Sequence, residues 1–299
     1  MLHPIATPVF VVLSLVASYI AYRAISRGYT RVASSSDTAE KKKYKSEPSH
    51  RSSVLVALAK KEVRKFISSA TYMLNGGMGA IMYIVLAVAG AINSESLTLA
   101  LDMLAAEIGL AIDYNAAIPA IAIAALVLVS STVTVSASAL SLEGKSYSML
   151  KSMPISPRTV ILAKLVPHVL VSSAASLIAS VILVVSFGIE PLYAVFVILT
   201  PIVANVFTAL VGITMNILLP KLEFENEVQP IKQSAAVGLT MLITMVIAMT
   251  YLGVSVFLSL MGLGALAVIL GTAVLILLSA VFAILAFIPM ARRLESISA

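Results

Sequence analysis

Cysteine and tryptophan are absent from this 299-residue sequence, and charged residues make up only 11% of it. The lack of cysteine excludes a disulfide framework and a thiolate metal site. Soluble domains carry roughly a quarter of charged residues, so the apolar surplus here, 60% of the chain, must face lipid. The net charge of +6 clusters at the ends of apolar segments and in one linker. This pattern suits an anionic membrane surface and argues against nucleic acid as a partner.

Seven apolar stretches are long enough to cross the hydrocarbon core, which takes about 20 residues of α-helix. None has the short length and alternating polarity of a barrel strand. We therefore predict an all-α integral membrane protein. Its expected spans are 5–22, 74–92, 117–140, 160–187, 192–219, 234–257 and 264–288.

Lysine and arginine are confined to alternate loops of this predicted topology. Twelve of the 20 lie between Arg23 and Lys65, and the others lie near the ends of later spans on the same side. The charged residues of the remaining loops are all acidic, namely Glu95, Asp102, Glu107, Asp113 and Glu190. By the positive-inside rule we expect a multi-pass plasma-membrane protein with its N-terminus outside and its C-terminus in the cytoplasm.

The predicted spans divide the chain into five parts. Residues 1–23 are expected to be a retained transmembrane anchor, because the basic residues follow its apolar stretch instead of preceding it. Residues 24–53 are too polar to bury a core and predict a flexible basic cytoplasmic linker. The pattern of 54–73 predicts an amphipathic interfacial helix. The six-span domain, 74–290, and a cytoplasmic tail, 291–299, complete the chain.

The junction between the interfacial helix and the six-span domain is expected to break. The helix carries Lys60, Lys61, Arg64 and Lys65 on its polar face. The residues that follow have low helix propensity and predict an interruption before the next span: Asn75, Gly76, Gly77 and Gly79.

No motif predicts a catalytic, cofactor-binding or metal site. Gly144-Lys145-Ser146 looks like the end of a phosphate-binding loop, but Ala139 stands where that loop needs a glycine, and an apolar helix precedes it instead of a strand. The three histidines lie far apart, and no nucleophile elbow is present. We therefore expect the chain not to be an enzyme. An intramembrane enzyme acting on lipids is the least favoured class.

None of the seven apolar stretches contains Asp or Glu. Ion-coupled transporters usually need a carboxylate within the membrane, so this absence disfavours secondary transport. The ionisable residues inside the spans are Lys164, expected to snorkel to the interface, and His168, expected to be a satisfied packing residue. If the protein moves anything uphill, the energy is expected from a partner.

Polar residues form stripes on the third and fifth spans. Stripes of small and hydroxylated residues let helices approach closely, and this use is favoured over lining of a translocation path. The two interpretations are compatible if the stripes meet at a subunit interface that opens. The candidate path-lining residues are Ser130, Thr134, Ser138, Asn205, Thr208 and Asn216.

Two long cytoplasmic loops carry the strongest signal. The run from Glu143 to Tyr147, continued from Leu150 to Pro157, resembles the first cytoplasmic loop of ABC-2 type exporter permeases of bacteria and archaea. The stretches 220–227 and 232–236 look like the second cytoplasmic loop of the same family. With the interfacial helix and the six spans, the resemblance covers about 54–290.

The resemblance implies a six-helix ABC-2 type transmembrane unit with an interfacial helix, to which this chain adds one N-terminal span. Two such halves would pair, and each would dock on a separate cytoplasmic ABC ATPase that binds Mg-ATP, so this chain would bind no cofactor. The ATPase-coupling loop would contain Glu143, Gly144, Lys145, Lys151 and Pro154. The second loop would contain Lys221, Glu223, Glu225, Glu227 and Lys232.

The alternative is a non-transporting polytopic scaffold or sensor. In that case the basic linker would bind a partner or anionic lipid, and the six-span domain would be dispensable for function. The polar stripes carry no formal charge, which hints at an amphipathic or apolar cargo if the chain is a permease.

Overall fold

The computed structural model describes residues 19, 23, 53–109 and 113–297. Most of the predicted first span and of the linker therefore lie outside the described residues. The chain divides into two units, Met1–Arg51 and Ser52–Ala299. The account below concerns the second unit.

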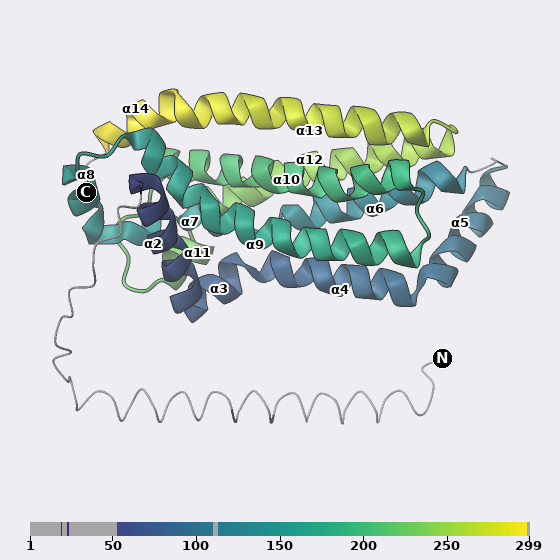
Figure 1. The fold of residues 1–299 in the computed structure, drawn as a ribbon, viewed down its shortest axis with the longest axis horizontal. Coiled ribbons are helices and arrows are strands. Elements are labelled where there is room, and N and C mark those ends of the chain that lie inside the picture. The colour runs from purple at the N-terminus through teal and green to yellow at the C-terminus, as the bar shows by residue number, and fades with distance from the viewer. Residues whose placement is uncertain (1–18, 20–22, 24–52, 110–112, 298–299) are drawn as a thin grey trace. The chain divides into compact units, whose positions relative to one another are not determined.

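All regular secondary structure in the described part of the second unit is helical, and no strand occurs there (Figure 1). The all-α prediction is confirmed at this level. The α-helices are α2 (Val54–Ser68), α3 (Ala70–Gly76), α4 (Met78–Ile92), α5 (Ser94–Ile108), α6 (Tyr114–Ser130), α7 (Val135–Ser138), α8 (Tyr147–Ser152), α9 (Pro157–Ser186), α10 (Pro191–Leu218), α11 (Val228–Lys232), α12 (Ala235–Leu260), α13 (Gly264–Phe287) and α14 (Pro289–Ser296). A 3₁₀ segment, η1 (Ser141–Ser146), precedes α8.

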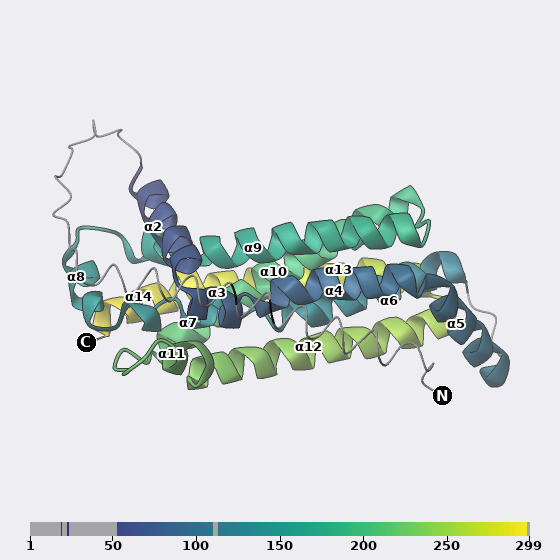
Figure 2. The same cartoon turned by 90° about the horizontal axis from the view of Figure 1, so that it is seen from below.

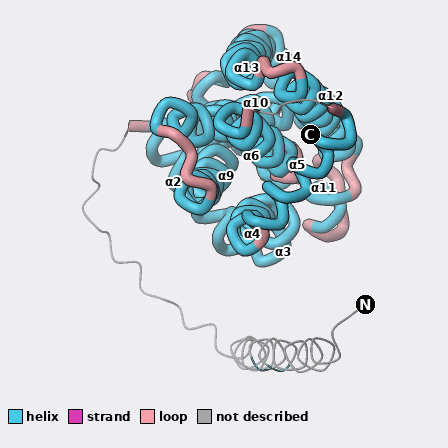
Figure 3. The backbone as a smooth tube through the Cα atoms, turned by 90° about the vertical axis from the view of Figure 1, so that its right-hand side faces the viewer, coloured by secondary structure: helices cyan, strands magenta, loops and turns pink. Residues whose placement is uncertain are grey.

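Among the described residues, five helical segments are long and apolar enough to cross a membrane, and the bent pair α3–α4 makes a sixth if it is one span. They coincide with the stretches predicted from 74 onward. In the end-on view of Figure 3, α6 and α10 lie among the other long helices. More than half of the apolar window of each is buried, against 17% for α13 and 22% for α12. The outer helices expose large apolar side chains such as Leu242 and Leu277, as lipid-facing surfaces do.

The predicted third span, 117–140, is not one continuous helix. It ends as α6 at Ser130 and resumes as the short α7, with a turn at 131–134. The hydroxyl groups of Ser131 and Thr132 donate hydrogen bonds to backbone carbonyls three residues earlier. Such bonds compete with helical ones, and β-branched residues lower helix propensity further. The prediction of a continuous span missed this local competition.

The chain also breaks twice before α4. The predicted interfacial helix 54–73 ends early, as α2, because Ser69 is extended and caps α3 by accepting a hydrogen bond from the backbone N–H of Tyr72. A second break at Gly77 bends α3 by 48° from α4, as the glycine-rich junction predicted. Gly79 is needed there for close packing, because a Cβ atom would lie 2.9 Å from the backbone nitrogen of Val133.

The charged residues gather at the two ends of the bundle, whose elements can be followed in Figures 1 and 2, and the acidic ones occur at both ends. We call the end that carries α2, η1, α8, α11 and α14 the basic end, because the described Lys and Arg residues from 60 onward lie there. The opposite end carries α5 together with the acidic residues of the outer loops.

Candidate functional site

A buried lysine stands at the centre of the basic end. Lys164 lies in the second turn of α9 and is 1% exposed. Its ammonium group donates hydrogen bonds to Glu143 Oε1 at 2.6 Å, to Glu62 Oε1 at 3.0 Å and to the carbonyl of Ala139 at 3.0 Å. The expectation that Lys164 snorkels to the interface is wrong, because α2 packs across α9 and supplies a carboxylate inside the protein.

Glu62 is the partner of Lys164 that sequence reasoning missed. It is 4% exposed and lies on the same face of α2 as the buried Phe66, four residues later. A carboxylate on the apolar face of a basic helix needs a buried cation as partner. That mismatch was the available signal, and Lys164 was the unpaired cation within the spans.

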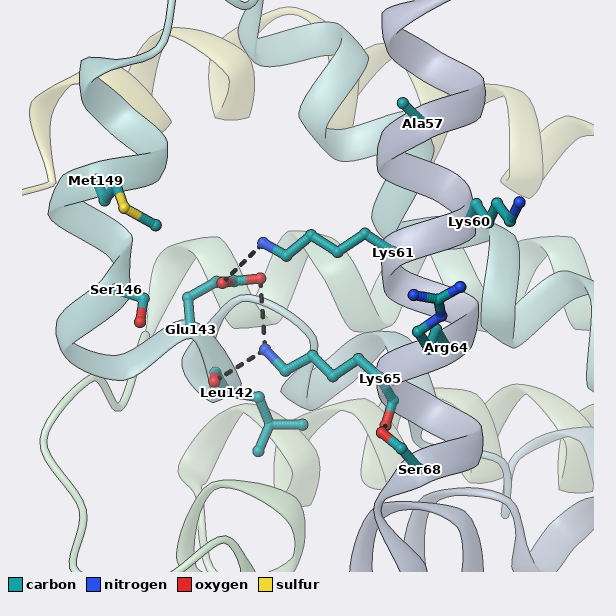
Figure 4. A pocket seen from close by; sticks show the side chains of 10 residues that line it. All are labelled: Ala57, Lys60, Lys61, Arg64, Lys65, Ser68, Leu142, Glu143, Ser146 and Met149. Carbon is teal, nitrogen blue, oxygen red and sulfur yellow. Dashed lines mark hydrogen bonds and ion pairs between the residues drawn. The ribbon is translucent and has the colours of Figure 1, made fainter. Parts of the chain in front are cut away.

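Five residues form what we call the ion cluster: Glu62, Glu143, Lys164, Lys61 and Lys65. Glu143 is its member from the connector, residues 141–156 between α7 and α9. Its second oxygen lies 3.5 Å from the Lys61 ammonium, and Oε1 lies 3.4 Å from that of Lys65 (Figure 4). Lys65 also donates to the carbonyl of Leu142 at 3.0 Å. Burial lowers the pKa of Lys65, and the charge of Glu143 opposes this effect. The cluster binds α2, the connector and α9 together.

The structure brings the two predicted cytoplasmic loops into contact. Gly144 has a positive φ of 51°, and a Cβ atom there would lie 3.1 Å from the ring of Phe224 in the second loop. Ser141 accepts a hydrogen bond from the backbone N–H of Lys221 at 2.9 Å. A cavity of about 880 Å³ lies between the loops and is lined by Glu143, Gly144, Lys145, Leu222, Glu223, Phe224, Glu225 and Gln229.

The remaining residues of the predicted coupling loop lie on its surface. Lys145, Lys151 and Pro154 are exposed, whereas Glu143 is buried and cannot itself reach a partner. Two hydrogen bonds attach the connector to α14 and to the residue that follows it. The Tyr147 hydroxyl donates to the carbonyl of Leu294 at 2.6 Å, and Lys151 donates to that of Ile297 at 3.1 Å.

The second loop is also largely exposed. Glu223, Glu225, Glu227 and Lys232 are exposed and Lys221 is half-buried. Glu227 accepts a hydrogen bond from the Ser69 hydroxyl at 2.6 Å. This loop is therefore connected to the junction between α2 and α3.

All six candidate path-lining residues are buried inside the helix bundle. Asn205 accepts from the Tyr83 hydroxyl at 2.9 Å and donates to Ser176 at 3.0 Å. The hydroxyl oxygens of Ser130 and Thr208 lie 3.5 Å apart. Ser130, Thr134 and Ser138 do not form one helical stripe, because α6 ends at the first of them.

Asn216 lies inside the bundle near the basic end and bonds to the start of the connector. Its side-chain oxygen accepts hydrogen bonds from the backbone N–H groups of Leu140 at 2.7 Å and Ser141 at 3.1 Å. Its amide group donates to the Ser141 hydroxyl at 2.7 Å. Asn216 thus satisfies backbone donors that the broken third span leaves unpaired.

His168 is only partly satisfied, contrary to expectation. Its Nδ1 accepts from the backbone N–H of Ser136 at 3.2 Å, which leaves Nε2 as the protonated nitrogen of a neutral ring. That Nε2 is buried and has no hydrogen-bond partner among the described residues.

The described residues contain no group of three or more metal-binding side chains. What they hold instead is the ion cluster, which joins α2, the connector and α9. Comparisons with protein-family models, with curated proteins and with solved structures find no match for this chain.

Proposed function

We propose that this chain is the membrane-spanning permease subunit of an ATP-driven ABC-2 type exporter. A separate ATPase would dock on the basic end, and a second permease half would complete the translocation path. Mg-ATP would bind to the ATPase, and hydrolysis would take place there.

The observation that carries the proposal is the construction of the 141–156 connector. Its outer face offers Lys145 and Lys151 to a partner, whereas its base is fixed through Glu143 to Lys164 of α9. A buried ion pair in low dielectric resists separation strongly. A displacement of the outer face would therefore move α9 and α2 with it, as coupling to a partner's closure requires.

The distribution of carboxylates supports an external energy source. The long helices α4, α6, α9, α10, α12 and α13 contain no Asp or Glu, and the two carboxylates that approach α9 come from α2 and the connector. Both are paired with lysine, so no buried carboxylate of the ion cluster is left to carry a coupling ion.

The test is purification of the tagged chain from its native membrane in mild detergent, followed by mass spectrometry of the proteins that accompany it. We expect a stoichiometric ATP-binding-cassette ATPase. The variant Lys145→Glu/Lys151→Glu should lose this ATPase, whereas Arg292→Glu, an exposed change at the same end, should keep it. A chain that reproducibly purifies alone would overturn the permease proposal and favour a scaffold.

A further inference from the structure

A basic groove separates α2 from the connector (Figure 4). Its volume is about 790 Å³, and it is lined by Ala57, Lys60, Lys61, Arg64, Lys65, Ser68, Leu142, Glu143, Ser146 and Met149. We call it the basic groove. Four of these ten residues are cations and one is an anion, so the groove has a surplus of positive charge.

The single carboxylate of the groove is already neutralised. Glu143 receives its shortest contact, 2.6 Å, from Lys164 beneath the groove, and Lys65 adds a second contact to the same oxygen. Lys60 and Arg64 are exposed, and neither forms a salt bridge with a described residue. The Lys60 side chain points away from the connector (Figure 4). Arg64, together with the half-exposed Lys61 at 3.5 Å from Glu143, therefore remains available for an external anion.

The other lining residues suit a ligand that is only partly polar. Ala57, Leu142 and Met149 give apolar walls, and the Ser146 hydroxyl is exposed. The groove opens beside α2, whose exposed Val54, Leu55 and Val56 suit the boundary between headgroups and acyl chains. An arginine with neighbouring lysines is the usual recognition set for phosphate oxygens.

We propose that the basic groove binds a phosphate group, with Arg64 and Lys61 as its principal ligands and Ser146 at its edge. The phosphate is that of an anionic phospholipid headgroup or of free phosphate. This inference does not rest on the proposed function, because it needs only the groove and a membrane location.

The experiment uses the full chain purified in mild detergent. One arm measures by native mass spectrometry how much phosphatidylglycerol stays bound relative to phosphatidylcholine. The other arm titrates inorganic phosphate and measures its binding by calorimetry. Both are repeated on Lys61→Gln/Arg64→Gln and on a matched control, Lys232→Gln/Arg292→Gln, which removes two exposed cations elsewhere at the basic end.

We expect the groove variant to bind at least about tenfold less phosphate ligand, while the control changes little. Loss confined to phosphatidylglycerol identifies a lipid headgroup, and a parallel loss of inorganic phosphate binding identifies a free phosphate. Equal losses in both variants would reduce the effect to general surface charge and overturn the proposal. Unchanged phosphate binding together with loss of a co-purifying protein would also overturn it, because the groove would then hold an acidic protein segment.

Discussion

The ammonium group of Lys164 lies 2.6 Å from a carboxylate oxygen of Glu143, although the two residues stand 21 positions apart and belong to a span and a connector. The same ammonium holds Glu62, 102 positions earlier, at 3.0 Å. Buried charges are stable only when their partners remain in place. Lys164 therefore links α9 to both α2 and the connector, while Lys61 and Lys65 of α2 contact Glu143 as well.

The first prediction concerns Lys164→Met. This change removes the salt-bridge partner of the buried Glu62 and one of the three ammonium groups around Glu143, and we expect it to cost about 3–5 kcal/mol of unfolding free energy. The measurement is an SDS titration in mixed micelles, with Lys232→Met, an exposed change, as control. Adding Glu62→Gln and Glu143→Gln should recover most of the loss, because neutral amides need no counter-charge. A triple variant that is less stable than the single one would contradict this account of the cluster.

The second prediction concerns coupling. Lys145→Glu and Lys151→Glu should each reduce export by at least about tenfold while changing unfolding by less than about 1 kcal/mol, because both side chains are exposed. Export in reconstituted vesicles that contain the ATPase is the readout, and Arg292→Glu is the control. Normal export by both variants would remove the connector face from the coupling route.

The third prediction concerns close packing between α10 and α7. A Cβ atom on Gly212 would lie 3.0 Å from the backbone nitrogen of Ala137 and would also meet the Ser136 hydroxyl. Gly212→Ala should therefore destabilise the protein by about 1–3 kcal/mol. Gly238→Ala is the matched control, because that Cβ would meet no atom within 4 Å and the helix gains propensity. Equal effects of the two changes would argue against the tight contact.

The fourth prediction uses the absence of cysteine, which gives every introduced thiol a clean background. Thr208→Cys is buried and should react with a polar maleimide at least about tenfold more slowly than the exposed Ser148→Cys in detergent. Faster labelling of Thr208→Cys when the ATPase and ATP are added would favour path lining. A rate equal to that of Ser148→Cys without a partner would contradict the packing seen here.

The fifth prediction concerns sidedness. In intact cells an impermeant maleimide should label Glu95→Cys in α5 and spare Lys145→Cys, and inside-out vesicles should give the reverse result. Both side chains are exposed at opposite ends of the bundle. Labelling of both from one side would exclude the orientation that the positive charges predict.

Sequence reasoning located the long helices well, because about 20 apolar residues in a row admit few structures other than a span. It located the interruptions less well. The glycines near Gly77 predicted one break, but the turn after Ser130 depends on hydroxyl groups that bond back to the helix, and these residues also occur inside regular helices.

For the ion cluster, the sequence signalled that Glu62 needs a buried cation but did not show which helix would supply it. Lys164 and Glu62 belong to segments that looked separate, one a span and one a basic surface helix, and their pairing depends on how α2 crosses α9. Helix periodicity gives the face on which a residue lies but not the helix that covers it. Which charges pair is therefore decided by tertiary packing, which the sequence pattern does not show.

The break after α6 and the break at Gly77 touch each other, because the backbone N–H of Thr134 donates to the carbonyl of Gly76 at 3.1 Å. The carbonyl left free at one interruption is thus paired with the N–H left free at the other, and both residues are buried. An insertion of one residue on either side would rotate the following helix by about 100° and separate the two interrupted segments. We expect evolutionary change in chain length to be concentrated in the outer loops, while these two segments keep a fixed number of residues.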